Sequence, residues 1–175
     1  MRLDHRKSVA SLNSLKDLPG TTDLRLAPQS HHLRHGRYSE HGRSYLITIV
    51  VHNRHRLFTD VFLGRLLVAE FRHAHELGLI DSLAWVIMPD HIHWLFELKQ
   101  KTLADVMRRI KSRSTLTINR RRQSKERVWQ PGYHDRAVRV EDDVRKMARY
   151  IIANPLRAGL VERVGDYSLW DAVWL

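Results

Sequence analysis

One stretch decides how this chain folds: MPDHIHWLF, residues 88–96. Its second half alternates histidine with apolar and aromatic residues, which is typical of a buried strand. The Pro-Asp pair before it predicts a tight connection from a preceding strand. Successive side chains of a strand point to opposite faces, so His91 and His93 share one face and Ile92 occupies the other. Two neighbouring imidazoles on a sheet are half of a metal site.

The segments around this strand predict a regular alternation of strands and helices. Strands are predicted from β-branched and apolar runs, and helices from apolar residues at helical spacing. Thr102, with Asp105 three residues later, predicts the start of one helix. The predicted elements are strand 44–52, helix 60–79, strand 83–88, strand 91–98, helix 103–121, strand or irregular hairpin 129–140, and a helix from 141 that ends by Pro155.

This order, β-α-β-β-α-β-α, predicts an α+β fold with a ferredoxin-like antiparallel sheet and helices on one face. The last helix can place one side near the central strands. Residues 41–175 are expected to form this catalytic domain. Residues 1–40 lack steady periodicity and carry basic and histidine residues, so we expect a basic, partly disordered N-terminal arm.

The charge of the chain favours a polyanionic partner. Its 175 residues hold 30 Lys and Arg against 19 Asp and Glu, a formal net charge of +11. DNA or RNA is the simplest such partner; a basic protein with no special partner, or one that binds acidic membrane surfaces, is the alternative. The absence of cysteine excludes disulfides, thiolate zinc sites and a cysteine nucleophile. No apolar run approaches the roughly 20 residues that span a bilayer, and the first residues are not a secretory signal, so we expect no membrane association and a cytoplasmic protein.

Tyr150 and Asn154 complete a candidate site with the histidine pair. Four residues apart on a predicted helix, they share one face. Taken singly, Tyr150 is a packing residue and Asn154 ends the helix before Pro155. Taken with His91 and His93, the Asn154 amide oxygen can be the third ligand of a divalent ion. Tyr150 then lies beside a phosphate bound to that ion. A phenol with a pKa of about 10 is a weak nucleophile at neutral pH, and the ion assists it by polarising the phosphodiester.

Three runs of the sequence resemble the REP-associated tyrosine transposases, which are single-tyrosine members of the HUH (His-hydrophobe-His) transposase superfamily. The runs are residues 88–95, 129–136 and 150–161, and the resemblance covers about residues 43–165. It implies cutting and joining of single-stranded DNA at hairpin-forming repetitive extragenic palindromes, in the bacterial cytoplasm at the nucleoid. It also implies Mg²⁺ or Mn²⁺ at His91 and His93, Tyr150 as the nucleophile that forms a 5′-phosphotyrosine, and Asn154 as a weaker third ligand. Asp90 is a departure, because family members often carry Asn there.

Two neighbouring residues, Tyr133 and His134, leave alternatives open. Tyr133 is a second candidate nucleophile, but it has no partner at helical spacing, so we prefer Tyr150. His134 is a spare ligand, a phosphate contact or a structural residue.

A basic run predicts where DNA lies. It spans the second long helix and the segment after it, and its acids stand only at the ends, which favours phosphate contacts over a merely solvated face. The predicted contacts are Arg108, Arg109, Lys111, Arg113, Arg120, Arg121, Arg122, Lys125 and Arg127. Sequence-reading contacts are expected from the region of Arg37, Tyr38, Arg43 and Tyr45.

Two other functions remain open from the sequence. The chain can be a non-catalytic module that binds DNA hairpins on the same fold. It can also be a metal-dependent phosphodiester hydrolase in which water attacks and Tyr150 only packs. The sequence leaves a monomer and a homodimer equally open.

Overall fold

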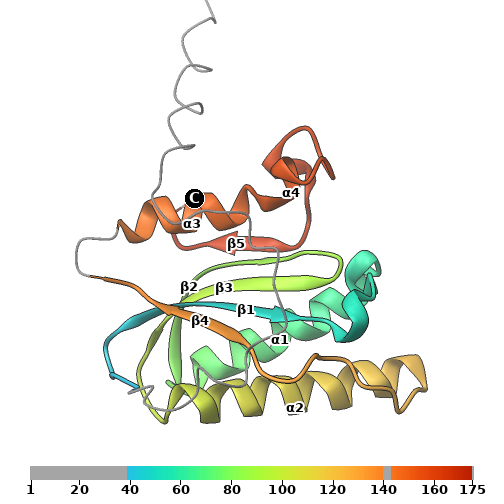
Figure 1. The fold of residues 1–175 in the computed structure, drawn as a ribbon, viewed down its shortest axis with the longest axis horizontal. Helices are drawn as coiled ribbons and strands as arrows, with labels where there is room; N and C mark the ends of the chain where they lie inside the picture. The colour runs from blue at the N-terminus through green and yellow to red at the C-terminus, as the bar shows by residue number, and fades with distance from the viewer. Residues whose placement is uncertain (1–38, 140–142, 175) are drawn as a thin grey trace, which may run out of the picture.

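The computed structural model describes residues 39–139 and 143–174. The elements follow the predicted order (Figure 1). They are β1 (Ser44–Val50), α1 (Val61–Glu76), β2 (Ile80–Ile87), β3 (His91–Leu98), α2 (Leu103–Arg122), β4 (His134–Ala137), α3 (Val144–Ile152), α4 (Asn154–Arg157) and β5 (Trp170–Ala172), with short 3-10 turns at His52–Arg54, Leu57–Thr59 and Val164–Asp166. Apart from residues 39 and 40, the predicted N-terminal arm lies outside the described residues.

The strands form one antiparallel sheet in the order β4-β1-β3-β2-β5. The first four strands have the arrangement of the ferredoxin-like pattern, so the predicted fold class is confirmed. β3 lies at the centre, with β1 and β2 on either side, which explains its apolar sequence. β5 was not predicted: its three residues are too few to show a period, and only pairing with β2 defines it.

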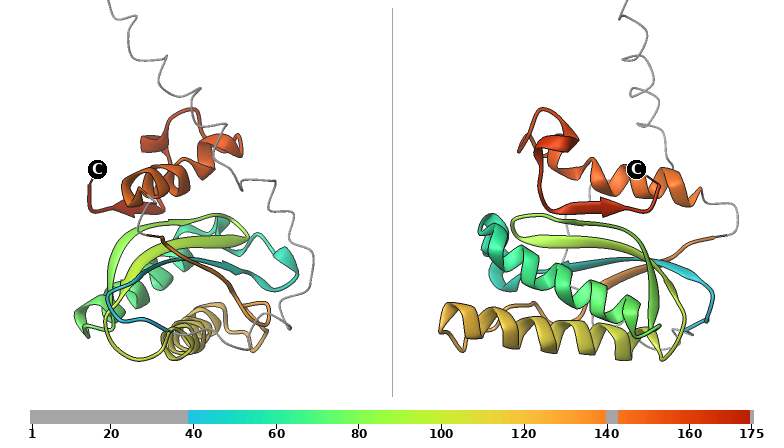
Figure 2. Two further views of the ribbon diagram at one scale, coloured as in Figure 1. Left: turned by 60° about the vertical axis from the view of Figure 1, so that its left-hand side comes forward. Right: turned by 180° about the vertical axis from the view of Figure 1, so that it is seen from behind.

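The helices divide between the two faces of the sheet. α1 and α2 pack against each other beneath the sheet, as expected of the ferredoxin-like pattern, whereas α3 lies on the other side, against β2, β3 and β5 (Figures 1 and 2). We call the face toward α1 and α2 the aromatic face. The face toward α3 is called the histidine face.

The aromatic face holds the larger core. From β3, Ile92, Trp94 and Phe96 are fully buried there. Trp94 stacks on Phe71 of α1, with ring centroids 4.1 Å apart, and lies 4.6 Å from the Phe96 ring. Its indole N–H donates to Ser82 Oγ at 3.0 Å, which satisfies its polar atom. Trp94 is therefore a core residue.

The histidine face holds a smaller apolar cluster. Val86 of β2 and Leu95 of β3 meet Ala148, Ile151 and Ile152 of α3. These contacts fix α3 over the β2 side of the sheet. Asp143 begins the helix, since its carboxylate accepts from the backbone N–H groups of the second and third following residues.

The fourth strand is shorter than the predicted 129–140. Only His134–Ala137 pairs with β1, because Pro131 has no N–H to donate and Gly132 turns the chain at a φ of +74°. Trp129 makes an isolated bridge to Val51 and is buried, its indole N–H donating to Ser114 Oγ at 3.0 Å. It is therefore a core residue.

Candidate active site

The histidine pair lies on β3 and faces α3. His91 and His93 alternate with Ile92 and Trp94 of the aromatic core, and they share the histidine face with Leu95. Their ring centroids are 4.9 Å apart. The paired imidazoles predicted from the sequence are thus partly exposed neighbours on one face.

Asp90 orients the first imidazole. Its Oδ1 lies 2.6 Å from His91 Nδ1, and its Oδ2 accepts from Arg54 at 3.0 Å. The hydrogen bond from His91 lowers the pKa of Asp90 to about 2, so the carboxylate is charged at neutral pH. With Nδ1–H donated to the carboxylate, the Nε2 atom of His91 keeps a lone pair that could coordinate a metal ion. The acid at this position therefore supports the site.

Thr48 orients the second imidazole. It lies directly opposite His93 on β1, and its Oγ1 is 2.9 Å from His93 Nδ1. Burial lowers the pKa of His93 to about 3, and the charges of His91 and Arg157 act in the same direction. His93 is therefore a neutral imidazole at physiological pH, the form that can bind a metal ion.

Among the residues that the structure describes, the two histidines have no His, Cys, Asp or Glu as a third ligand. No group of three His, Cys, Asp or Glu residues that could hold an ion occurs within residues 39–139 and 143–174. The predicted third donor, Asn154, uses its amide oxygen to accept from Arg157 Nη2 at 2.7 Å. Its amide N–H₂ donates to the Ile151 carbonyl at 2.7 Å. A carbonyl oxygen has two lone pairs, so the hydrogen bond leaves one available.

The expectation that Tyr150 and Asn154 share one helix is wrong. Tyr150 belongs to α3, which ends at Ile152, and Asn154 opens the separate α4. The break follows from Pro155, which has no N–H for the carbonyl four residues earlier, that of Ile151. The Asn154 side chain supplies the missing donor, so the two helices remain joined across the break.

Arg157 connects Tyr150 to the rest of the site, and the sequence did not single it out. Its guanidinium carbon lies 3.8 Å from the centroid of the Tyr150 ring, and its Nη2 donates to the Tyr150 carbonyl at 2.8 Å. Its charge also contributes, after burial and the charge of His91, to the lowered pKa of His93. The spacing of Tyr150, Asn154 and Arg157, four and then three residues, is the signal that could have revealed it.

Tyr133 and His134 lie on opposite faces of the sheet. Tyr133 packs against the core of the aromatic face, on the side of the sheet away from His91 and His93. His134 lies directly opposite Thr48, which in turn is opposite His93, so His134 shares the histidine face two strands away. This arrangement supports Tyr150 over Tyr133 as the candidate nucleophile.

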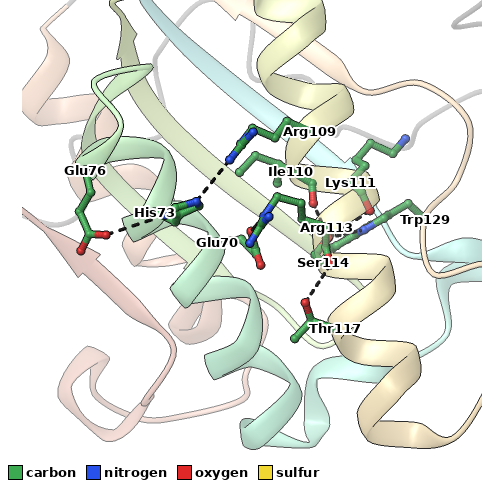
Figure 3. Close-up of polar contacts among 10 residues, drawn as sticks. All are labelled: Glu70, His73, Glu76, Arg109, Ile110, Lys111, Arg113, Ser114, Thr117 and Trp129. Atoms are coloured by element: carbon green, nitrogen blue, oxygen red, sulfur yellow. Dashed lines mark hydrogen bonds and ion pairs between the residues drawn. The ribbon is translucent and has the colours of Figure 1, made fainter.

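Part of the basic run on α2 serves packing (Figure 3). Arg113 Nε donates to the buried Glu70 of α1 at 2.7 Å, and Arg109 lies 3.3 Å from His73 of the same helix. Lys111 Nζ donates to the backbone carbonyls of residues 130 and 132, at 2.7 Å each. These three predicted DNA contacts hold α2 against α1 and against the loop before β4.

The remainder of the basic run is more open. Arg108 and Arg122 form surface ion pairs with Asp105 and Glu126. The other four residues are exposed and form no ion pair with any residue that the structure describes: Arg120, Arg121, Lys125 and Arg127.

A pocket lies at the end of the run, where the loop after α2 passes the end of β1. It has a volume of about 320 Å³, and its lining includes His52, His55, Arg122 and Arg127. Glu126 also lines the pocket and pairs with Arg122, so Arg127 is the lining arginine that forms no ion pair with a described residue.

The contacts predicted nearer the N-terminus differ from expectation. Tyr45 is 3% exposed in the aromatic core, and its hydroxyl accepts from the Glu40 N–H at 3.0 Å. Its ring cannot stack on a base, so this predicted DNA contact is corrected to a core residue. Arg43 pairs with Glu40 at 2.6 Å and stays partly exposed. Arg37 and Tyr38 lie outside the described residues.

No helix within the described residues is long and apolar enough to span a bilayer.

The profile of the family described as "Transposase IS200 like" matches residues 39–154, which include the histidine pair and the α3–α4 junction.

Two relatives and a solved structure illustrate the similarity of this chain to known proteins. A REP-associated tyrosine transposase of Escherichia coli K12 is 30% identical over 86 residues, 48% of this chain but only 49% of the relative. A Haemophilus influenzae protein provisionally given the same name is 26% identical over 141 residues, 72% of this chain and 77% of the relative. The solved structure is a REP-associated tyrosine transposase bound to a REP hairpin, with a TM-score of 0.63 at 25% identity, covering 77% of this chain and 79% of that one.

The resemblance seen in three short runs of sequence is thereby confirmed over most of the described domain. The histidine pair, the tyrosine and the ferredoxin-like sheet all fall inside the matched region. This chain belongs to the family of IS200-like transposases.

Proposed function

We propose that this protein cuts and rejoins single-stranded DNA at hairpin-forming repetitive palindromes, with Tyr150 as the nucleophile. One observation carries the proposal. The histidine pair faces α3, and Tyr150 of α3 packs against the apolar cluster on that same face of the sheet. Membership in a transposase family agrees with this chemistry.

The donor set of the site fits a divalent ion, which we propose to be Mg²⁺ or Mn²⁺. Asp90 and Thr48 engage the Nδ1 atoms of His91 and His93, so both Nε2 atoms are available as ligands. Asn154 offers a weaker amide oxygen. Such an ion, when bound, supplies charge neutralisation at the phosphodiester and at the departing 3′ oxygen.

The protein's own residues account for the covalent step. The Tyr150 hydroxyl loses its proton to solvent, its oxygen bonds to phosphorus, and the bond from phosphorus to the 3′ oxygen breaks. The departing oxygen takes up a proton as a 3′ hydroxyl, and the 5′ phosphate stays on the tyrosine. Because the phosphotyrosine is again a phosphodiester, a free 3′ hydroxyl can reverse the step or join a new end.

The DNA partner is inferred from charge and from the solved relative. That relative is bound to a REP hairpin, and this chain carries a net charge of +11. We expect the exposed Arg120, Arg121, Lys125 and Arg127 to contact phosphates and so to position the hairpin without reading its sequence. Since the substrate is chromosomal, we expect the protein to act at the bacterial nucleoid.

One assay tests this function against its two rivals. The protein is incubated with end-labelled hairpin DNA carrying a single-stranded flank, with Mn²⁺, and run on a denaturing gel. We expect a DNA–protein adduct in the native protein and none in Tyr150→Phe. Cleavage without an adduct would instead identify a hydrolase, and binding without cleavage would identify a non-catalytic hairpin-binding module.

A further inference from the structure

Arg157 occupies a position that the packing of the fold alone does not require. Pro155 leaves the Ile151 carbonyl without a helical donor, and Asn154 already repairs that loss through its amide N–H₂. Arg157 makes two additional bonds through Nη2, to the Tyr150 carbonyl at 2.8 Å and to Asn154 Oδ1 at 2.7 Å. It therefore ties the turn that carries the nucleophile to the predicted third ligand.

The guanidinium also restrains the tyrosine ring. It stacks over Tyr150 with 3.8 Å between its central carbon and the ring centroid, a cation–π contact that limits rotation of the ring. A lysine could supply the charge, but it has no planar group to stack while donating to two oxygens. The contact is specific to arginine.

The charge of Arg157 has no ion-pair partner within residues 39–139 and 143–174. Packing against protein atoms partly desolvates the guanidinium and lowers its pKa, yet no carboxylate of the described residues forms an ion pair with it. Its Nε and Nη1 groups make no hydrogen bond to the described residues, so three of its five N–H donors are available. Part of the side chain remains exposed. A partly desolvated cation with spare donors is suited to an anionic ligand.

The structure assigns to Arg157 a role as the phosphate-binding residue beside Tyr150. Its Nη2 group holds the turn that carries the nucleophile. Its remaining N–H donors bind a non-bridging oxygen of the attacked phosphate. This inference rests on the proposed function, because it takes the ligand to be the phosphodiester of the DNA substrate. Arginine suits this role because its Nη2 donates to two protein oxygens while Nε and Nη1 keep separate N–H donors for phosphate oxygens, an arrangement that the single ammonium group of lysine cannot hold in one plane.

The test measures binding separately from cutting. A fluorescent hairpin with a single-stranded 5′ flank is titrated without divalent ions at several KCl concentrations, so that no cleavage occurs. Arg157→Gln is expected to reduce the slope of log Kd against log salt by about 0.7, the loss of one single-strand phosphate contact. Arg163→Gln is the matched control: Arg163 is 82% exposed and pairs with Asp166, so the slope should not change.

Adduct formation with Mn²⁺ is then measured on the same variants. Arg157→Gln should slow it about 100-fold, as expected for removal of one preorganised donor at a developing charge. Arg157→Lys should keep the salt slope but bind DNA several-fold more weakly and form adduct about tenfold more slowly, because an ammonium cannot stack on the Tyr150 ring while it donates to both protein and phosphate oxygens.

The outcomes separate the two proposals. If Arg157→Gln binds DNA with the native affinity and salt slope, Arg157 does not bind phosphate. If the native protein forms no adduct while Arg157→Gln still loses slope, the phosphate contact stands and the tyrosine chemistry is wrong. Should Arg157→Gln fail to fold by circular dichroism, Arg157→Lys decides: native DNA affinity in that variant would overturn the assignment.

Discussion

The two faces of the sheet use the same central strand for different purposes. Toward α1 and α2, β3 presents Trp94 among stacked aromatic rings that are closed to water. Toward α3 it presents His91 and His93, each held by one polar neighbour and each partly exposed. Because side chains alternate along a strand, stability and chemistry are carried by adjacent residues that do not touch the same partners.

This separation depends on how α3 covers the sheet. The helix packs on β2, β5 and β3 through a small apolar cluster, and its contacts do not extend to β1 and β4 to the same degree. Thr48 and His134 therefore remain partly exposed beside the histidine pair, and Arg136 further along β4 is exposed. We expect the chemistry to tolerate changes on the aromatic face, and the fold to tolerate changes on the histidine face.

The largest expected effect is on the histidine face. His91→Ala should reduce Mn²⁺-dependent cutting to the uncatalysed background, because it removes one of two imidazole ligands. The free energy of unfolding should change by less than about 1 kcal/mol, since the side chain is partly exposed. A labelled-DNA gel and urea denaturation measure the two quantities. An unfolded His91→Ala protein would show that the histidine is structural.

The neighbouring substitution on the aromatic face should do the opposite. Trp94→Ala removes a fully buried ring stacked on Phe71 and should cost about 3–5 kcal/mol of unfolding free energy. Trp94→Phe, which keeps most of the apolar volume, is the control and should cost less. A loss below about 1 kcal/mol in the alanine variant would contradict the assignment of stability to this face.

The residue that orients the first imidazole should have an intermediate effect. Asp90→Ala leaves His91 Nδ1 without its acceptor and should weaken Mn²⁺ binding about 10–100-fold in calorimetric titration. Asp90→Asn keeps an oxygen that can accept from Nδ1 and should retain most of the affinity. Equal metal affinity in Asp90→Ala and the native protein would remove Asp90 from the site.

The smallest expected effects distinguish the residues of the basic run that contact DNA from those that pack α2 against α1. Arg121→Gln should lower the salt slope of hairpin binding by about 0.9 and leave stability unchanged, since Arg121 is exposed. Arg113→Gln should leave the slope unchanged and destabilise the protein by about 1–3 kcal/mol, because the buried Glu70 loses its partner. Anisotropy titrations and urea denaturation measure both variants. The same slope loss in both would contradict this division.

The sequence alone predicted those features that depend on the spacing of residues within a single strand or helix. The alternation of residues 88–96 predicts both the central strand and the shared face of His91 and His93, and the helical spacing of α1 and α2 predicts their buried sides. Thr102 caps α2 as predicted, its hydroxyl oxygen accepting from the Asp105 N–H at 3.1 Å. Local rules apply there because nothing distant competes with them.

The sequence did not predict the role of residues whose contacts come from distant parts of the chain. Tyr45 lies in a strand, but its pairing opposite Phe96 places it in the core and away from DNA. Arg113 belongs to the basic run of α2, but it forms an ion pair with Glu70 of α1 and so is not available to DNA. These outcomes follow from tertiary contacts that no local period contains.

The most direct test of the account identifies the residue that carries DNA after cutting. The native protein is reacted with hairpin DNA and Mn²⁺, digested with nuclease and trypsin, and analysed by mass spectrometry. The account predicts a nucleotide on the tryptic peptide of residues 150–157, which contains Tyr150 as its only tyrosine. A nucleotide on the peptide of residues 128–136, which contains Tyr133, or cut DNA with no modified peptide, would contradict it.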